Sequence, residues 1–168
     1  MKQIRLLALP IAICLNLAAM SFAAETNSPP ENKSVPETGP LAALAAGVLH
    51  QGGVFPLDTK MALALGLISV DGLNRAIMVP EAEADGGNTW IEVARTKGRT
   101  YLILGHSEIS ANGVGLTVYL TSPSGVLEKA ARRINGGEFS VVPLNDAATG
   151  FNNQVTFWQA WLAQSARP

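Results

Sequence analysis

The sequence predicts an α+β fold, in which an antiparallel sheet is packed by a C-terminal amphipathic helix and by shorter helices. Three strand-like segments joined by short connections follow one another between residues 90 and 121. Successive strands of this kind pair antiparallel, because a tight turn reverses the chain. Residues 151–162 carry apolar side chains at helical spacing, and such a helix must bury its apolar face against another element. We therefore expect this helix and the shorter helices to cover one face of the sheet.

The N-terminus is typical of a secretory signal peptide. Lys2 and Arg5 form a positive start, and residues 6–20 are mostly apolar. Small residues precede the expected cleavage site after Ala23. We therefore expect residues 1–23 to be removed and the mature protein to lie in a bacterial periplasm.

Two alternatives to the signal peptide stay open. A membrane anchor needs roughly 20 apolar residues, whereas this run is shorter and contains the helix breaker Pro10. A lipoprotein would carry its lipid on Cys14, but Ile13 stands where lipid attachment requires glycine or alanine. We therefore expect no stable membrane insertion once the signal peptide has been removed.

Composition excludes several function classes. Cys14 is the single cysteine and would leave with the signal peptide, so a cysteine nucleophile, a redox pair and a thiolate metal site are excluded. Losing Lys2 and Arg5 would change the net charge from −1 to −3. No segment is strongly basic, so we expect no nucleic acid partner. The expected partner is another envelope protein.

The mature chain divides into a tether and one domain. Residues 24–39 contain three prolines and almost nothing to bury, which is typical of a disordered segment. Residues 40–168 suit a single α+β globular domain, because a chain of this length buries roughly two thirds of its unfolded surface.

Two short helices are expected at the start of this domain. The first spans residues 40–50, with Pro40 in its first turn and Gly52 at its end. Asp58 is expected to cap the second helix, which ends near Gly66.

Residues 67–79 are ambiguous. Asp71 and Gly72 lie between two apolar runs, which favours a β-hairpin. The same segment also fits a helix that begins at Asp71 and points Leu73, Ile77 and Met78 inward. We prefer the hairpin, followed by an acidic loop over residues 82–88.

The clearest strands come next. Residues 90–95 and 100–104 are joined by a short turn at 96–98, in which Gly98 supplies a positive φ. Apolar and polar side chains alternate over residues 116–121, which is typical of a strand with one buried face. These segments predict a three-stranded antiparallel meander.

A further helix is expected after the meander, with Ser122 as its cap and Pro123 in its first turn. Gly136 would end this helix. Its apolar stripe would consist of Leu127, Ala130, Ala131 and Ile134. Residues 138–143 are then expected to form an edge strand, because Pro143 cannot donate to a ladder.

The C-terminal helix is the clearest single element. Its predicted face consists of Phe151, Val155, Trp158 and Leu162, widened by Phe157 and Trp161. These positions recur at the period of 3.6 residues that one face of a helix requires.

Residues 106–113 are expected to form a polar loop that joins two strands and carries recognition. The binding residues that we single out in it are His106, Ser107, Glu108 and Asn112. Neighbouring residues on an extended chain point to opposite sides, so Ser107 and His106 do not suit a nucleophile and its base. We therefore expect no catalytic residues in this segment.

We also expect neither a cofactor nor a metal site. His50 and His106 stand at unrelated positions, and the acidic residues 81–85 lack the spacing of a calcium loop. The glycine-containing segments lack the patterns that bind phosphate groups.

These observations favour an exported, non-catalytic binding protein: an inhibitor, an immunity-type protein or an accessory subunit of an envelope machine. One alternative is a small periplasmic hydrolase that uses His106 with a carboxylate. Another is a carrier of a small ligand, which would need an apolar pocket under the last helix.

Overall fold

The computed structural model describes residues 38–67, 74–80 and 87–165. All of them belong to the second of two compact units, Ser34–Pro168. The expected signal peptide and all but the end of the tether lie outside the described residues and stay predictions. Within the described part of the chain, no helix is long and apolar enough to cross a membrane.

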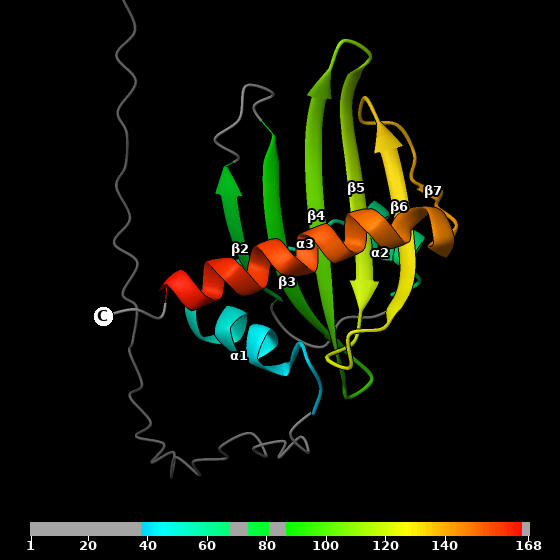
Figure 1. The fold of residues 1–168 in the computed structure, drawn as a ribbon. Helices are drawn as coiled ribbons and strands as arrows, with labels where there is room; N and C mark the ends of the chain where they lie inside the picture. The colour runs from blue at the N-terminus through cyan, green and yellow to red at the C-terminus, as the bar shows by residue number, and fades with distance from the viewer. Residues whose placement is uncertain (1–37, 68–73, 81–86, 166–168) are drawn as a thin grey trace, which may run out of the picture. The chain divides into compact units, whose positions relative to one another are not determined.

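The described residues form a seven-stranded antiparallel sheet, which confirms the predicted α+β class (Figure 1). The strands lie side by side in chain order, so each one pairs with the next. Their bounds are β1 (Gly53–Phe55), β2 (Asn74–Pro80), β3 (Asn88–Thr96), β4 (Arg99–Ser110), β5 (Gly113–Thr121), β6 (Leu127–Ile134) and β7 (Ser140–Val141).

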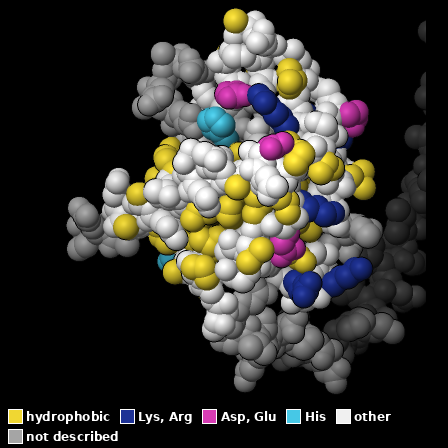
Figure 2. Space-filling view, turned by 45° about the vertical axis from the view of Figure 1, so that its right-hand side comes forward, with side chains coloured by type: hydrophobic (Ala, Val, Ile, Leu, Met, Phe, Trp, Pro, Cys, Tyr) yellow, Lys and Arg dark blue, Asp and Glu magenta, His cyan; other side chains and the backbone are white. Residues whose placement is uncertain are grey.

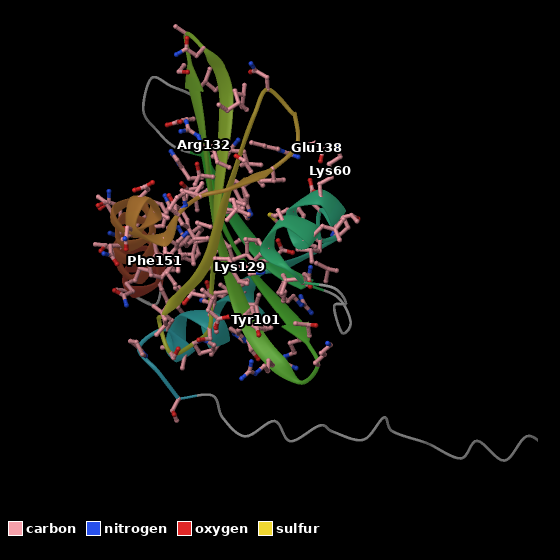
Figure 3. The ribbon with its side chains drawn as sticks, turned by 90° about the vertical axis from the view of Figure 1, so that its right-hand side faces the viewer. Lys60, Tyr101, Lys129, Arg132, Glu138 and Phe151 are labelled. Carbon is pink, nitrogen blue, oxygen red and sulfur yellow. The ribbon has the colours of Figure 1, made fainter. Side chains whose placement is uncertain are left out.

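Helices cover both faces of this sheet, not one face as expected. Helices α1 (Ala42–Gln51) and α3 (Leu144–Ser165) lie on one side, and α2 (Thr59–Leu65) lies on the other (Figures 1 and 3). We call these sides the α3 face and the α2 face. The change of side has a simple cause: between α1 and α2 the chain forms β1, the edge strand, and passes around the edge of the sheet.

The predicted meander is confirmed as β3, β4 and β5. Residues 97 and 98 form the turn between the first two strands, and both have positive φ, 50° at Lys97 and 73° at Gly98. Such a two-residue turn matches the twist of the strands on either side. The strands run further than predicted, since β4 continues to Ser110 and β5 begins at Gly113.

The prediction of a loop over residues 106–113 is therefore wrong, because only Ala111 and Asn112 lie between the strands. Its polar composition suggested a loop. A strand needs alternating apolar residues only where helices cover it, however, and this end of β4 becomes progressively exposed.

The helix expected after Ser122 is also wrong, because Leu127–Ile134 is strand β6. Ala130 and Ala131 are both buried. Ala130 belongs to the core on the α3 face, and Ala131 belongs to the core on the α2 face. Two consecutive buried residues remove the alternation that would have indicated a strand. The Ser-Pro pair begins a turn instead, in which Gly125 N–H donates to Ser122 O at 2.9 Å.

The other short elements follow the sequence more closely. Helix α1 ends at Gly52 as expected. Asp58 caps α2, and its carboxylate accepts the Met61 N–H at 3.0 Å. Residues 74–80 are strand β2, so the helical alternative for this part is wrong, while the proposed turn at Asp71–Gly72 lies outside the described residues. The expected edge strand is β7.

The α3 face holds the larger core. Phe151 and Trp158 are buried against the sheet, and Val155, Trp161 and Leu162 pack at the border of this core. Phe157 does not widen the buried stripe, because it stays partly exposed with its ring edge-on to Trp158. Figure 2 views this face obliquely and shows hydrophobic side chains across its middle, with charged side chains above and to the right.

Candidate functional site

The four residues singled out in the sequence do not form one surface. The register pairs His106 with Thr117 and Glu108 with Gly115 on the α3 face. Ser107 pairs with Leu116 on the α2 face, where both line a pocket. Asn112 lies in the turn between β4 and β5. The alternation of side chains along β4 therefore separates Ser107 from its two neighbours.

The polar side chains at this end of β4 make contacts within the sheet. Ser107 Oγ accepts the Asn88 N–H at 2.8 Å and donates to the Asn88 carbonyl at 3.3 Å. His106 Nδ1 lies 3.4 Å from Thr89 Oγ1. Glu108 pairs with Arg132 of β6 on the α3 face. Ser107 and His106 are thus engaged on opposite faces and do not form a nucleophile–base pair.

A pocket of about 310 Å³ lies on the α2 face. Its walls come from the first six strands and from the beginning of α2. It is lined by Phe55, Pro56, Asp58, Met61, Ala76, Met78, Asn88, Trp90, Glu92, Ser107, Leu116 and Arg133. Most of this lining is apolar, as in typical pockets for small molecules. A carrier pocket was expected under the last helix. The observed pocket lies instead on the opposite side of the sheet, beside α2.

Trp90 forms one wall of the pocket because Gly105 leaves room for it. The two residues are direct partners in the β3–β4 ladder. A Cβ atom at residue 105 would overlap the indole ring of Trp90. On the next strand, Met78 is the partner of Trp90 and extends the same apolar wall toward solvent.

Glu92 is the buried ionisable group of the pocket. It is 5% exposed, and its Oε1 accepts a hydrogen bond from Asn74 Nδ2 at 2.7 Å. Burial raises the pKa of the Glu92 carboxyl to about 7; the Asn74 hydrogen bond acts against this, and the charge of Asp58 adds to it. A carboxyl with this pKa exists in both the neutral and the ionised form near neutral pH.

The remaining charges of the pocket compensate each other. Arg133 Nη1 lies 3.4 Å from Asp58 Oδ2, and the guanidinium of Arg133 also lies 4.9 Å from the centre of the Phe139 ring. Within the described residues, no lysine or arginine forms an ion pair with Glu92 in the way that Arg133 pairs with Asp58. Glu92 is thus the carboxyl whose charge the pocket leaves unbalanced.

Sequence reasoning missed this site. In the sequence, Glu92 lies between Ile91 and Val93, and this alternation normally places a glutamate on the wet face of a half-buried strand. The pocket becomes visible only when the register brings Ala76, Trp90 and Glu92 together beneath the start of α2. A usable signal was Gly105, because a glycine inside a strand indicates the close approach of another group.

The described residues contain no group of three His, Asp or Glu side chains placed to hold a metal ion. Comparisons with family models, with curated proteins and with solved structures found no match for this chain. We therefore infer function from the geometry of the α2 face.

Proposed function

We propose that this chain is an exported, non-catalytic binding protein that holds a small, largely apolar ligand in the pocket on the α2 face. The observation that carries the proposal is the pocket itself. Its volume of about 310 Å³ lies at the lower end of the roughly 300–1,000 Å³ that is usual for ligand sites. It combines apolar walls with a few polar groups that would orient a ligand.

The apolar residues at the pocket mouth support ligand binding. Phe55 and Met78 are 45% and 55% exposed, although each lines the pocket. A ligand lying between them would remove this apolar surface from water, which is favourable by roughly 25 cal/mol per Å². Methionine also adapts its shape to different ligands, because its side chain is unbranched and flexible.

The contacts of the polar residues support a non-catalytic role. The Ser107 hydroxyl already makes two hydrogen bonds to the backbone of Asn88. A serine nucleophile needs a base within about 3 Å, and His106 points to the other face of the sheet. A hydrolase that used His106 would have its imidazole on the α3 face, whereas the pocket that would hold a substrate lies on the α2 face.

The proposal is tested by comparing ligand binding by the wild-type protein with binding by a variant whose pocket is filled. Calorimetric titration with hexan-1-ol is expected to show saturable binding to the wild-type protein. Ala76→Leu fills the pocket with an apolar side chain and should weaken binding at least about tenfold, since it occupies the ligand volume. Ala160→Leu, the same change at an exposed position of α3, should leave binding unchanged. Equal binding by Ala76→Leu, or absence of binding of hexan-1-ol and of charged analogues of the same chain length alike, would refute the proposal.

Export is tested separately. The protein expressed in a Gram-negative host should be recovered from the periplasmic fraction, and its N-terminal residue should be Ala24. A protein that keeps residues 1–23 and stays in the cytoplasm would contradict this part of the proposal.

Binding of another envelope protein is the second candidate function. Ile109 and Val114 are cross-strand partners at the end of the β4–β5 hairpin, and both are about half exposed. Contiguous exposed apolar surface marks protein contacts when it is large, and this pair would lie at the centre of such a contact. Replacing both with serine should abolish a cross-link to a specific envelope partner, whereas Leu63→Ser, at an exposed position of α2, should retain it. A cross-link that survives the double change would exclude this surface.

A further inference from the structure

We propose that the pocket on the α2 face selects a small organic amine, whose ammonium group pairs with Glu92 while its apolar body lies against Trp90 and Met78. This inference rests on the proposed function and adds the chemical class of the ligand. It follows from the charges, the hydrogen-bonding groups and the shape of the pocket.

The charges of the pocket favour a cation. Its charged side chains are Asp58, Glu92 and Arg133, and the other lining residues carry no titratable group. Asp58 and Arg133 face each other at 3.4 Å and cancel. A ligand that enters beside Glu92 therefore meets one carboxyl without a cationic partner in the described residues.

The hydrogen-bonding groups favour a ligand that donates. Asn74 uses its amide nitrogen to bond Glu92, while Asn74 Oδ1 is buried and finds no donor among the described residues. Asn74 lies outside the pocket lining, so the Glu92 carboxylate is the acceptor that faces a ligand. An ammonium group, with three N–H donors, matches this acceptor better than a carboxylate or an ether does.

The walls of the pocket suit the rest of an amine. The indole of Trp90 is held in place over Gly105, and an aromatic face attracts a nearby cation. Phe55 and Met78 offer apolar surface toward the pocket mouth. The arrangement places the acid deep in the site and the apolar residues outside it, so a ligand would enter with its ammonium group first.

Binding of an amine is coupled to the release of a proton from Glu92. In the free protein, burial raises the pKa of Glu92 to about 7, with Asp58 contributing in the same direction. An ammonium group stabilises the ionised form and lowers this pKa. Amine binding at pH 7 should therefore release about half a proton from Glu92. A neutral ligand of the same size should release none.

The experiment compares three probes with the same alkyl chain: hexylamine, hexan-1-ol and hexanoate. Calorimetric titration at pH 8 should show hexylamine binding about ten- to a hundredfold more tightly than hexan-1-ol, as expected for a charge-assisted hydrogen bond. Lowering the pH to 5 should remove most of this preference. Repeating the titration at pH 7 in two buffers of different ionisation enthalpy measures the released proton.

Variants identify the carboxylate. Glu92→Gln keeps the size and the acceptor oxygen, and it should bind hexan-1-ol normally while losing the preference for hexylamine. Asp58→Asn keeps an N-cap and should retain most of the preference. Glu108→Gln, the same change as Glu92→Gln on the opposite face, should behave as the wild type.

The outcomes separate the two proposals. If hexan-1-ol or hexanoate binds as tightly as hexylamine, the ligand class is wrong but the binding function stands. If the preference persists in Glu92→Gln or disappears only in Asp58→Asn, the assignment to Glu92 is overturned. If none of the probes binds to the wild-type protein, the proposed function fails, and this inference fails with it.

Discussion

The two faces of one sheet are covered to very different extents. On the α3 face, a helix of 22 residues is about 33 Å long, and it lies across the strands (Figure 1). The six spacings of a seven-stranded sheet add up to about 29 Å, so this helix is long enough to cross all of it. On the α2 face, a helix of seven residues is about 10 Å long and reaches across roughly two spacings.

This difference in helix length explains where the candidate site lies. Beside α2, the sheet packs against Met61, Ala62 and Leu65 and forms a smaller core. At the start of α2 this packing ends, and Trp90 and Glu92 of the same face line a pocket. Figure 3 shows the sheet edge-on, with α3 on one side and α2 on the other. The face with the incomplete helical layer thus has space for a ligand.

The largest expected effect contrasts two tryptophans. Trp158 of α3 is 0% exposed, and Trp158→Ala should lower the free energy of unfolding by about 3–5 kcal/mol, because it leaves a cavity in the core. Trp90→Ala should cost only roughly 1–2 kcal/mol, since its indole borders an open pocket, but it should abolish binding of hexan-1-ol. Urea unfolding measures both losses. Equal losses would mean that the two faces are packed alike.

A second test uses the pH dependence of stability. The folded-state pKa of Glu92, about 7, lies above its ordinary value of 4.5. Glu92 therefore binds its proton more tightly in the folded state than in the unfolded state. The contribution of this proton to the free energy of unfolding is complete below pH 4.5. It is lost as the pH rises to 7, by about 3 kcal/mol in total.

Glu92→Gln should remove this loss, so the variant should be more stable than the wild type at pH 8 and similar to it at pH 4. Urea unfolding at a series of pH values checks the difference. Glu108→Gln breaks an exposed ion pair with Arg132 and should change stability by less than about 1 kcal/mol. A difference between wild type and Glu92→Gln that does not vary with pH would contradict the raised pKa.

Two strand glycines provide a third, smaller contrast. Gly105→Ala should push Trp90 from its place and cost about 1–3 kcal/mol, because a Cβ atom would overlap the indole ring. Gly115→Ala, on the α3 face, meets mainly the flexible end of Glu108 and should cost less. Thermal unfolding gives the stabilities, and hexan-1-ol binding should weaken only in Gly105→Ala. Similar behaviour of the two variants would argue against a wall built on Gly105.

The smallest expected effect concerns the helix beside the pocket. Asp58→Ala removes the N-cap of α2 and should cost about 1 kcal/mol, whereas Asp58→Asn can still accept the Met61 N–H and should cost less. Hydrogen exchange of the α2 amides checks whether the loss is confined to this helix. Equal protection in the two variants would show that the cap hydrogen bond at 3.0 Å does not hold α2 in place.

Local sequence patterns were sufficient to predict the elements that depend on neighbouring residues. The turn at Lys97–Gly98, the cap at Asp58 and the buried stripe that includes Trp158 each depend on residues close together in sequence. Strand β6 and the pocket could not be found in this way. The burial of both Ala130 and Ala131 depends on helices outside strand β6, and these helices cover opposite faces of the sheet.

The sequence by itself determined the antiparallel meander and the amphipathic C-terminal helix, because turn chemistry and hydrophobic period are local properties of the chain. Only the tertiary structure decided which face each helix covers and how Glu92, Trp90 and Met78 meet. The physical reason is that a side chain in a strand is buried or exposed according to what packs on its face, and here that depends on the path of the chain around strand β1. The same glutamate would have an ordinary pKa on a fully solvated sheet, and the pocket beside α2 gives it a different one.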